Sequence, residues 1–168
     1  MKMRLRFWSV AIAMGVLLAG PVMLSAKGPK PVSGKKFAAA AQAALAAMKA
    51  KAAELKIQGV AVVSFAPGDV IESWMSQMAV VGHMTDHLNG EKGNNLLGIA
   101  YAKASEMANT LKNSGTSGKP PMTGEFGWQG GVVAKAPRGT IIVAFSGGKS
   151  EDDVQVSKAG LAVIQSKL

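Results

Sequence analysis

Apolar side chains recur along this chain with two different periods. Between residues 37 and 57 they return every three or four positions, with lysines and a glutamate between them, and this spacing predicts an amphipathic helix. The same period predicts a second helix over 95–112, with Leu97, Tyr101 and Leu111 on its core face. A third helix is predicted from Ser150 to Lys167.

Runs rich in β-branched residues separate these helices and predict strands. One pair covers 60–65 and 70 to about 78, with Pro67 and Gly68 in the central positions of a type II turn. A second pair covers 131–135 and 140–145. The order is therefore helix, hairpin, helix, hairpin, helix. It predicts an α+β fold, a three-layer-like α/β arrangement in which helices flank a central antiparallel sheet of about four to five strands.

The first 26 residues have the composition of an export signal. Lys2, Arg4 and Arg6 precede an apolar run over 7–19, which ends in a Gly-Pro pair and small residues. We expect cleavage after Ala26, a flexible linker over 27–36 and a domain over 37–168, which would make the protein periplasmic or secreted. The alternative is an uncleaved N-terminal membrane anchor.

Charge and cysteine content narrow the possible functions. The formal net charge is +9, but residues 1–36 carry seven of the 19 basic residues and no acidic one, so the domain itself is at +2. Aromatic residues make up 5% of the chain, and neither a nucleic-acid partner nor, after cleavage, a membrane partner is predicted. The chain has no cysteine, hence no disulfide, and no recognisable nucleophile motif. A binding protein is therefore favoured over an enzyme.

The sequence FSGGKSEDDV at 145–154 places Gly-Lys-Ser between a predicted strand and a predicted helix, as a phosphate-binding loop does. Such a loop needs a glycine five residues before its Gly-Lys pair, and Val143 stands there. The acidic residues at 151–153 would also repel a phosphate at the helix N-terminus. We therefore expect a plain turn in which Ser150 caps the helix and Asp153 completes a capping box.

His83 and His87 are the candidate ligand-binding residues. A spacing of four would put them on one face of a helical turn, where with Met84 they could hold copper or another transition metal. A haem needs one imidazole over an apolar pocket, and Trp74 and Trp128 could line that pocket. Both histidines could equally be solvated loop residues, and the tryptophans ordinary core.

The segment GTIIVAFSGGKSEDDVQVSKAGL at 139–161 resembles the C-terminal signature of the GlcG/HbpS-like haem-binding family, formerly a domain of unknown function. The Gly-Gly strand entry at 130–133, the hairpin VAVVSFAPGDVIESW and the helix LLGIAYAKASEMA are similar to further elements of that family. The resemblance covers about 37–168. It implies an antiparallel sheet with flanking helices, frequent oligomerisation, and haem or corrinoid-related binding in several members, but it assigns no axial ligand.

The leading hypothesis is thus an exported, non-catalytic protein that binds a small molecule, haem or a related tetrapyrrole. His83 or His87 would be the ligand, and the protein would be a homo-oligomer or an accessory subunit. One alternative is a periplasmic copper protein that uses His83, Met84 and His87. The other is a structural subunit of a larger extracytoplasmic complex, without a cofactor.

Overall fold

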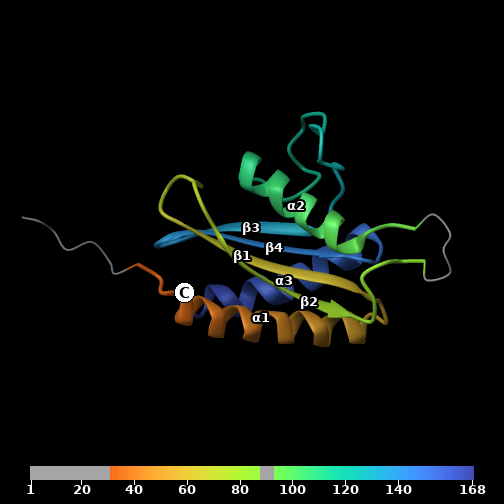
Figure 1. The fold of residues 1–168 in the computed structure, drawn as a ribbon, viewed down its shortest axis with the longest axis horizontal. Helices are drawn as coiled ribbons and strands as arrows, with labels where there is room; N and C mark the ends of the chain where they lie inside the picture. The colour runs from red at the N-terminus through yellow and green to blue at the C-terminus, as the bar shows by residue number, and fades with distance from the viewer. Residues whose placement is uncertain (1–30, 88–92) are drawn as a thin grey trace, which may run out of the picture.

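The computed structural model describes residues 31–87 and 93–168, so the predicted export signal over 1–26 lies outside the described residues. The elements follow one another in the predicted order (Figure 1), which confirms the α+β fold. They are α1 (Gly34–Glu54), β1 (Gly59–Pro67), β2 (Met75–Val81), α2 (Leu96–Thr110), β3 (Gly131–Ala136), β4 (Gly139–Ser146) and α3 (Ser150–Gln165). Among these residues, no helix combines the length and the apolar composition needed to cross a membrane.

The sheet is antiparallel throughout and has the strand order β2-β1-β4-β3. Val62 in β1 pairs with Met78 in β2 on one side and with Ala144 in β4 on the other. The two central strands are buried along almost their whole length, whereas every residue of β2 is half-buried. This difference follows from position, because β1 and β4 have a strand on each side and β2 forms an edge.

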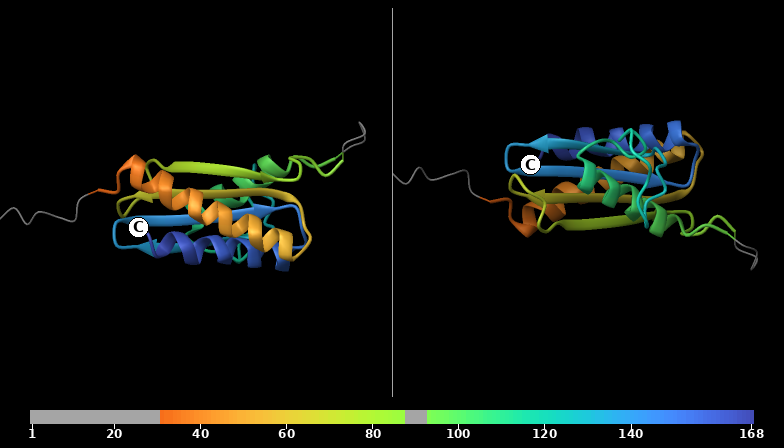
Figure 2. Two further views of the ribbon diagram at one scale, coloured as in Figure 1. Left: turned by 90° about the horizontal axis from the view of Figure 1, so that it is seen from below. Right: turned by 90° about the horizontal axis from the view of Figure 1, so that it is seen from above.

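Helices cover both faces of the sheet, α1 and α3 on one and α2 on the other (Figure 2). Alternate residues of β1 point to opposite faces, so Val63 belongs to the core beneath α1 and α3, and Val62 to the core beneath α2. Beside this second core, Ser64 donates a hydrogen bond to Ser76 (2.9 Å), whose hydroxyl lies 3.0 Å from that of Tyr101.

Three local features differ from the expectations. Strand β2 begins at Met75 rather than at residue 70, and residues 68–74 form a longer connection instead of a tight turn. Helix α1 begins at Gly34, inside the predicted linker, because the Ser33 hydroxyl caps it by accepting from the Lys36 amide (3.2 Å). The preceding Val32 is buried, so this part of the segment packs onto the domain.

The two remaining corrections concern helix ends. Leu111, predicted on the core face of α2, is the C-cap residue and is 49% exposed. Ser150 does not cap α3: the N-cap position is Lys149, whose side chain makes no capping bond, and Asp153 accepts from the Gly148 amide instead. The carboxylate four residues into α3 thus replaces the expected hydroxyl cap.

Candidate functional site

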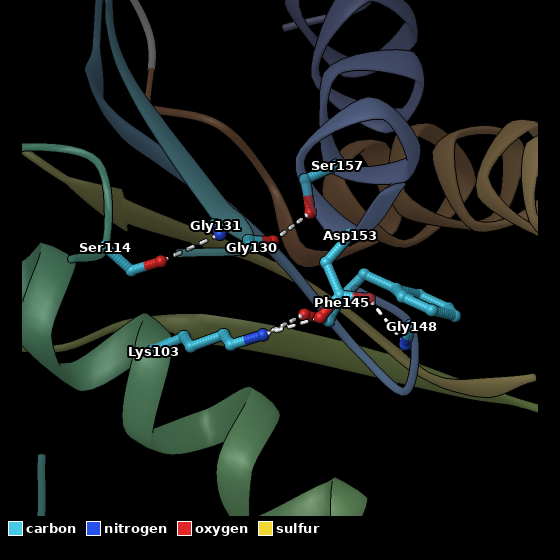
Figure 3. Close-up of polar contacts among 8 residues, drawn as sticks. All are labelled: Lys103, Ser114, Gly130, Gly131, Phe145, Gly148, Asp153 and Ser157. Carbon is cyan, nitrogen blue, oxygen red and sulfur yellow. Dashed lines mark hydrogen bonds and ion pairs between the residues drawn. The ribbon is translucent and has the colours of Figure 1, made fainter. Parts of the chain in front are cut away.

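A buried ion pair joins α2 and α3, which lie on opposite faces of the sheet (Figure 3). Lys103 of α2 places its ammonium 2.8 Å from a carboxylate oxygen of Asp153 in α3, and both side chains are 3% exposed. The same ammonium donates to the Phe145 carbonyl of β4 (2.9 Å). Because a buried charge is tolerated only when it is paired and hydrogen-bonded, these contacts fix α2, β4 and α3 relative to one another.

The adjacent glycines Gly130 and Gly131 leave the space that this arrangement needs. A Cβ atom on Gly130 would overlap the Lys103 ammonium, and one on Gly131 would overlap the end of the Met107 side chain. Their backbone groups are also used: the Ser157 hydroxyl donates to the Gly130 carbonyl (2.6 Å), and the Gly131 amide donates to the Ser114 hydroxyl (2.8 Å). Gly130 is therefore a packing requirement of the buried ion pair, and Gly131 is one of the packing of Met107.

The turn between β4 and α3 already holds an anion, which is the chain's own Asp153. One carboxylate oxygen accepts from the Gly148 amide (2.8 Å) while the other meets Lys103. Burial raises the pKa of Asp153 above its ordinary value of 3.8, against the opposing effects of the Lys103 ammonium and of the Gly148 and Gly147 amides. The Asp153 carboxylate thus occupies the Gly148 amide and the Lys103 ammonium, which are the donors of this turn that an anion would otherwise use.

A small cavity of about 160 Å³ opens above this pair. Lys103, Asp153 and the Gly147–Gly148 turn line it. Asp86 and Asn94 form one further part of its wall, and Trp128 forms another. The cavity thus brings together three parts of the sequence: residues on either side of the start of α2, the Trp128 loop and the turn between β4 and α3.

The wall with Asp86 is a short antiparallel arm that extends from β2 toward α2. Thr85 forms an isolated β-bridge with Asn95, and the Leu96 amide donates to the Met84 carbonyl (2.9 Å). The Asp86 carboxylate accepts from both the backbone and the side-chain amide of Asn94. These two bonds hold the pKa of Asp86 below its ordinary value, with a smaller contribution from His87.

The predicted ligands His83, Met84 and His87 all lie on this arm, but not on a helical turn. The bridge at Thr85 is flanked by bends at Gly82, Met84 and Asp86, and none of residues 82–87 is helical. His83 is half-buried, whereas His87 is exposed, with its Nε2 atom 4.0 Å from an Asp86 carboxylate oxygen. Within the described ranges no three His, Cys, Asp or Glu side chains group as metal ligands.

Trp128, which lines the cavity, belongs to an exposed aromatic pair. Phe126 and Trp128 stack with ring centroids 4.9 Å apart, and they are 47% and 48% exposed. Trp74, predicted as a possible second wall of the same pocket, instead packs partly buried against the core beneath α2. Trp128 therefore stacks on Phe126 and does not share a pocket wall with Trp74.

Sequence reasoning did not identify Lys103 or Asp153 as a pair. A signal for Lys103 is present, because its spacing from Leu96, Ala100 and Met107 puts a lysine within the buried stripe of α2. Asp153 gave no such signal, since acidic residues are ordinary in the first turn of a helix.

Comparisons with known proteins bear on the fold. Neither the protein-family models nor the curated proteins gave a match. Among solved structures, the chain is similar to the Klebsiella pneumoniae protein ORFY of the DUF336 family, at 19% identity and a TM-score of 0.53, over 77% of this chain and 90% of that one. The chain has the fold of the GlcG-like DUF336 proteins. A PduOC–haem complex is also similar, at 14% identity and a TM-score of 0.51, over 80% of this chain and 95% of that one.

The described residues of this DUF336-like fold meet the demands of a haem in part. Trp128 of the stacked aromatic pair lines the cavity, and so does Asp86, the residue before His87, whereas His83 and His87 are not among the lining residues. Cavities that enclose drug-sized ligands measure about 300–1,000 Å³, and this one measures about 160 Å³. The lining therefore offers an aromatic surface but does not fit an enclosed macrocycle.

Proposed function

We propose that this protein is an exported, non-catalytic binding protein for haem or a related tetrapyrrole. The observation that carries the proposal is the cavity that is lined by Asp86, the residue before His87, and by Trp128 of the stacked aromatic pair. The fold similarity to a haem complex supports the same ligand class.

His83 or His87 would hold the group through its imidazole, and the bound group would supply the iron that this imidazole coordinates. Phe126 and Trp128 would cover part of one apolar face, because exposed aromatic side chains gain most when a flat apolar partner removes them from water. The fastening of Asp86 to Asn94 keeps the arm in place before the ligand arrives, which reduces the entropy lost on binding.

The test is a haemin titration of the purified protein, followed by the Soret band. We expect a saturable shift that is lost in one of the two variants His83→Ala and His87→Ala. Trp128→Ala should weaken binding about tenfold. Met122→Ala is the matched control, since this side chain is 57% exposed and does not line the cavity.

Two outcomes would count against the proposal. An absent Soret shift would remove the haem hypothesis and leave the accessory-subunit alternative. A shift that survives in both single histidine variants and in the double variant would exclude imidazole ligation.

Export rests on the sequence of the first 26 residues and needs its own test. Intact mass spectrometry of the protein from the extracytoplasmic fraction should give a chain that begins at Lys27. A full-length chain found in the membrane fraction would instead support the uncleaved anchor.

A further inference from the structure

The cavity above the Lys103–Asp153 pair does not fit an enclosed macrocycle, but it has room for a smaller molecule. Its volume is about 160 Å³. A water molecule in the liquid takes up about 30 Å³, so the space equals that of about five water molecules. An organic molecule of a few heavy atoms fits such a space, and the lining residues indicate which kind of molecule that is.

Ser146, the last residue of β4, presents a hydroxyl to this cavity. Side chains alternate along a strand, so Ser146 lies on the face beneath α2 together with Ile142 and Ala144. It lines the cavity and is 4% exposed. None of the described residues donates to its hydroxyl or accepts from it. This buried hydroxyl is therefore available to a molecule in the cavity.

The charged residues of the lining leave one negative charge without a cation. Among the described residues that line the cavity, Lys103, Asp153 and Asp86 are charged. Lys103 and Asp153 neutralise each other, with 2.8 Å between the ammonium nitrogen and a carboxylate oxygen. Asp86 accepts from the uncharged backbone and side-chain amides of Asn94, and these bonds hold its pKa below the ordinary value and keep its carboxylate ionised. The lining therefore attracts a cation and repels an anion.

The unused hydrogen-bonding groups of the lining suit a primary ammonium ion. The Asn94 side chain donates its N–H to Asp86, and no described residue donates to its carbonyl oxygen. The Asp86 carboxylate and the Ser146 hydroxyl can each accept a further hydrogen bond. An ammonium group has three donors and no acceptor, so three acceptors in the lining match its three donors.

We propose that this cavity binds a small primary amine in its ammonium form. The ammonium group donates to the Asp86 carboxylate and to the Ser146 hydroxyl. A short hydrocarbon chain lies against Leu96, Ile99 and Trp128, the large apolar residues of the lining. The inference does not rest on the proposed function, because it concerns a space that a macrocycle cannot enter and it uses no imidazole. Either can fail without the other.

The first test titrates the 15N-labelled protein with three probes that have four carbon atoms each and differ in charge: n-butylamine, butan-1-ol and butyrate. At about pH 7.5 an alkylamine is protonated and an ordinary imidazole is mostly neutral. We expect n-butylamine to shift the amide signals of Asn94 and Gly148 and the indole signal of Trp128 saturably. Butan-1-ol should bind about tenfold more weakly, and butyrate should give no saturable shift. Equal affinity for the amine and the alcohol, or no saturable shift with the amine, would overturn the proposal.

The second test removes the two groups that receive the ammonium, one on the arm and one on the sheet. Asp86→Asn removes the charge and keeps the size of the side chain, and Ser146→Ala removes the hydroxyl. Each should weaken the binding of n-butylamine about tenfold. Ser146→Ala should not lower the urea midpoint, because no described residue bonds to this hydroxyl, so lost binding in this variant does not reflect lost folding.

Asp69→Asn is the matched control for the change in charge. Asp69 is an exposed acidic residue on the β1–β2 connection and does not line the cavity, so this variant should bind n-butylamine as the wild type does. A loss in Asp69→Asn equal to that in Asp86→Asn would mean that binding reflects net charge alone, and would reject the cavity as the site. Unchanged binding in either cavity variant would reject it as well.

Discussion

Replacing Lys103 by methionine tests the central structural claim, that a buried ion pair fixes α2 to α3. Methionine keeps most of the length and apolar character of the lysine stem but removes the ammonium. The carboxylate of Asp153, 3% exposed, then loses its cation, and the Phe145 carbonyl loses its donor. Breaking a buried pair in this way costs about 3–5 kcal/mol. Small domains are stable by only about 5–15 kcal/mol, so the variant should be severely destabilised.

The double variant Lys103→Met with Asp153→Asn separates the charge from the packing. It removes both charges, and the asparagine carbonyl can still accept from the Gly148 amide. We expect it to recover most of the loss and to remain about 1–2 kcal/mol below the wild type, because the Phe145 carbonyl stays without its donor. Lys158→Met on exposed α3 surface is the control, with an effect within about 0.5 kcal/mol.

The deficit should also depend on pH, and its sign follows from the raised pKa of Asp153. At a pH below the pKa of Asp153 in the unfolded chain, its carboxyl is protonated in both the folded and the unfolded state. The loss of the Lys103 ammonium then costs little stability. As the pH rises above that value, the unfolded chain ionises first, so stability falls until the folded-state pKa is passed. Lys103 lowers the folded-state pKa of Asp153, so its removal raises that pKa. The pH range over which stability falls therefore becomes wider.

Urea unfolding followed by circular dichroism between pH 3 and pH 8 measures these differences. Three results would refute the reasoning: a cost of Lys103→Met below about 1 kcal/mol at pH 7, a deficit that does not shrink in acid, or a double variant as unstable as the single. Any of them would mean that the pair is not the link between the helices.

Three further predictions concern neighbouring features. Gly130→Ala should lower the thermal midpoint strongly, at a cost of about 2–4 kcal/mol, because the residue has φ +137° and a Cβ would overlap the Lys103 ammonium. Tyr101→Phe should cost about 1 kcal/mol in urea unfolding, through loss of its hydrogen bond to a β2 serine. Asp86→Ala should speed hydrogen exchange at the Asn94 amide and leave global stability unchanged, and acid that protonates Asp86 should do the same to the wild type.

The fold was predictable because its elements are encoded locally. The spacing of apolar residues in α1 and α2 and the β-branched runs of β1 and β4 each report burial within a single element. The start of β2 was not predictable in this way. Val70 and Ile71 continue an apolar pattern, but Val70 is 69% exposed on the connection and pairing with β1 begins only at Met75.

The candidate site was much less predictable, because tertiary contacts create it. Lys103 and Asp153 are 50 residues apart in the sequence, and they meet only once α2 and α3 have packed onto the two faces of the sheet. His83 and His87 were recognisable as possible ligands, but their relation depends on whether the segment is helical. A single bridge between Thr85 and Asn95, flanked by bends, takes the place of a helical turn, and that bridge has no local signal.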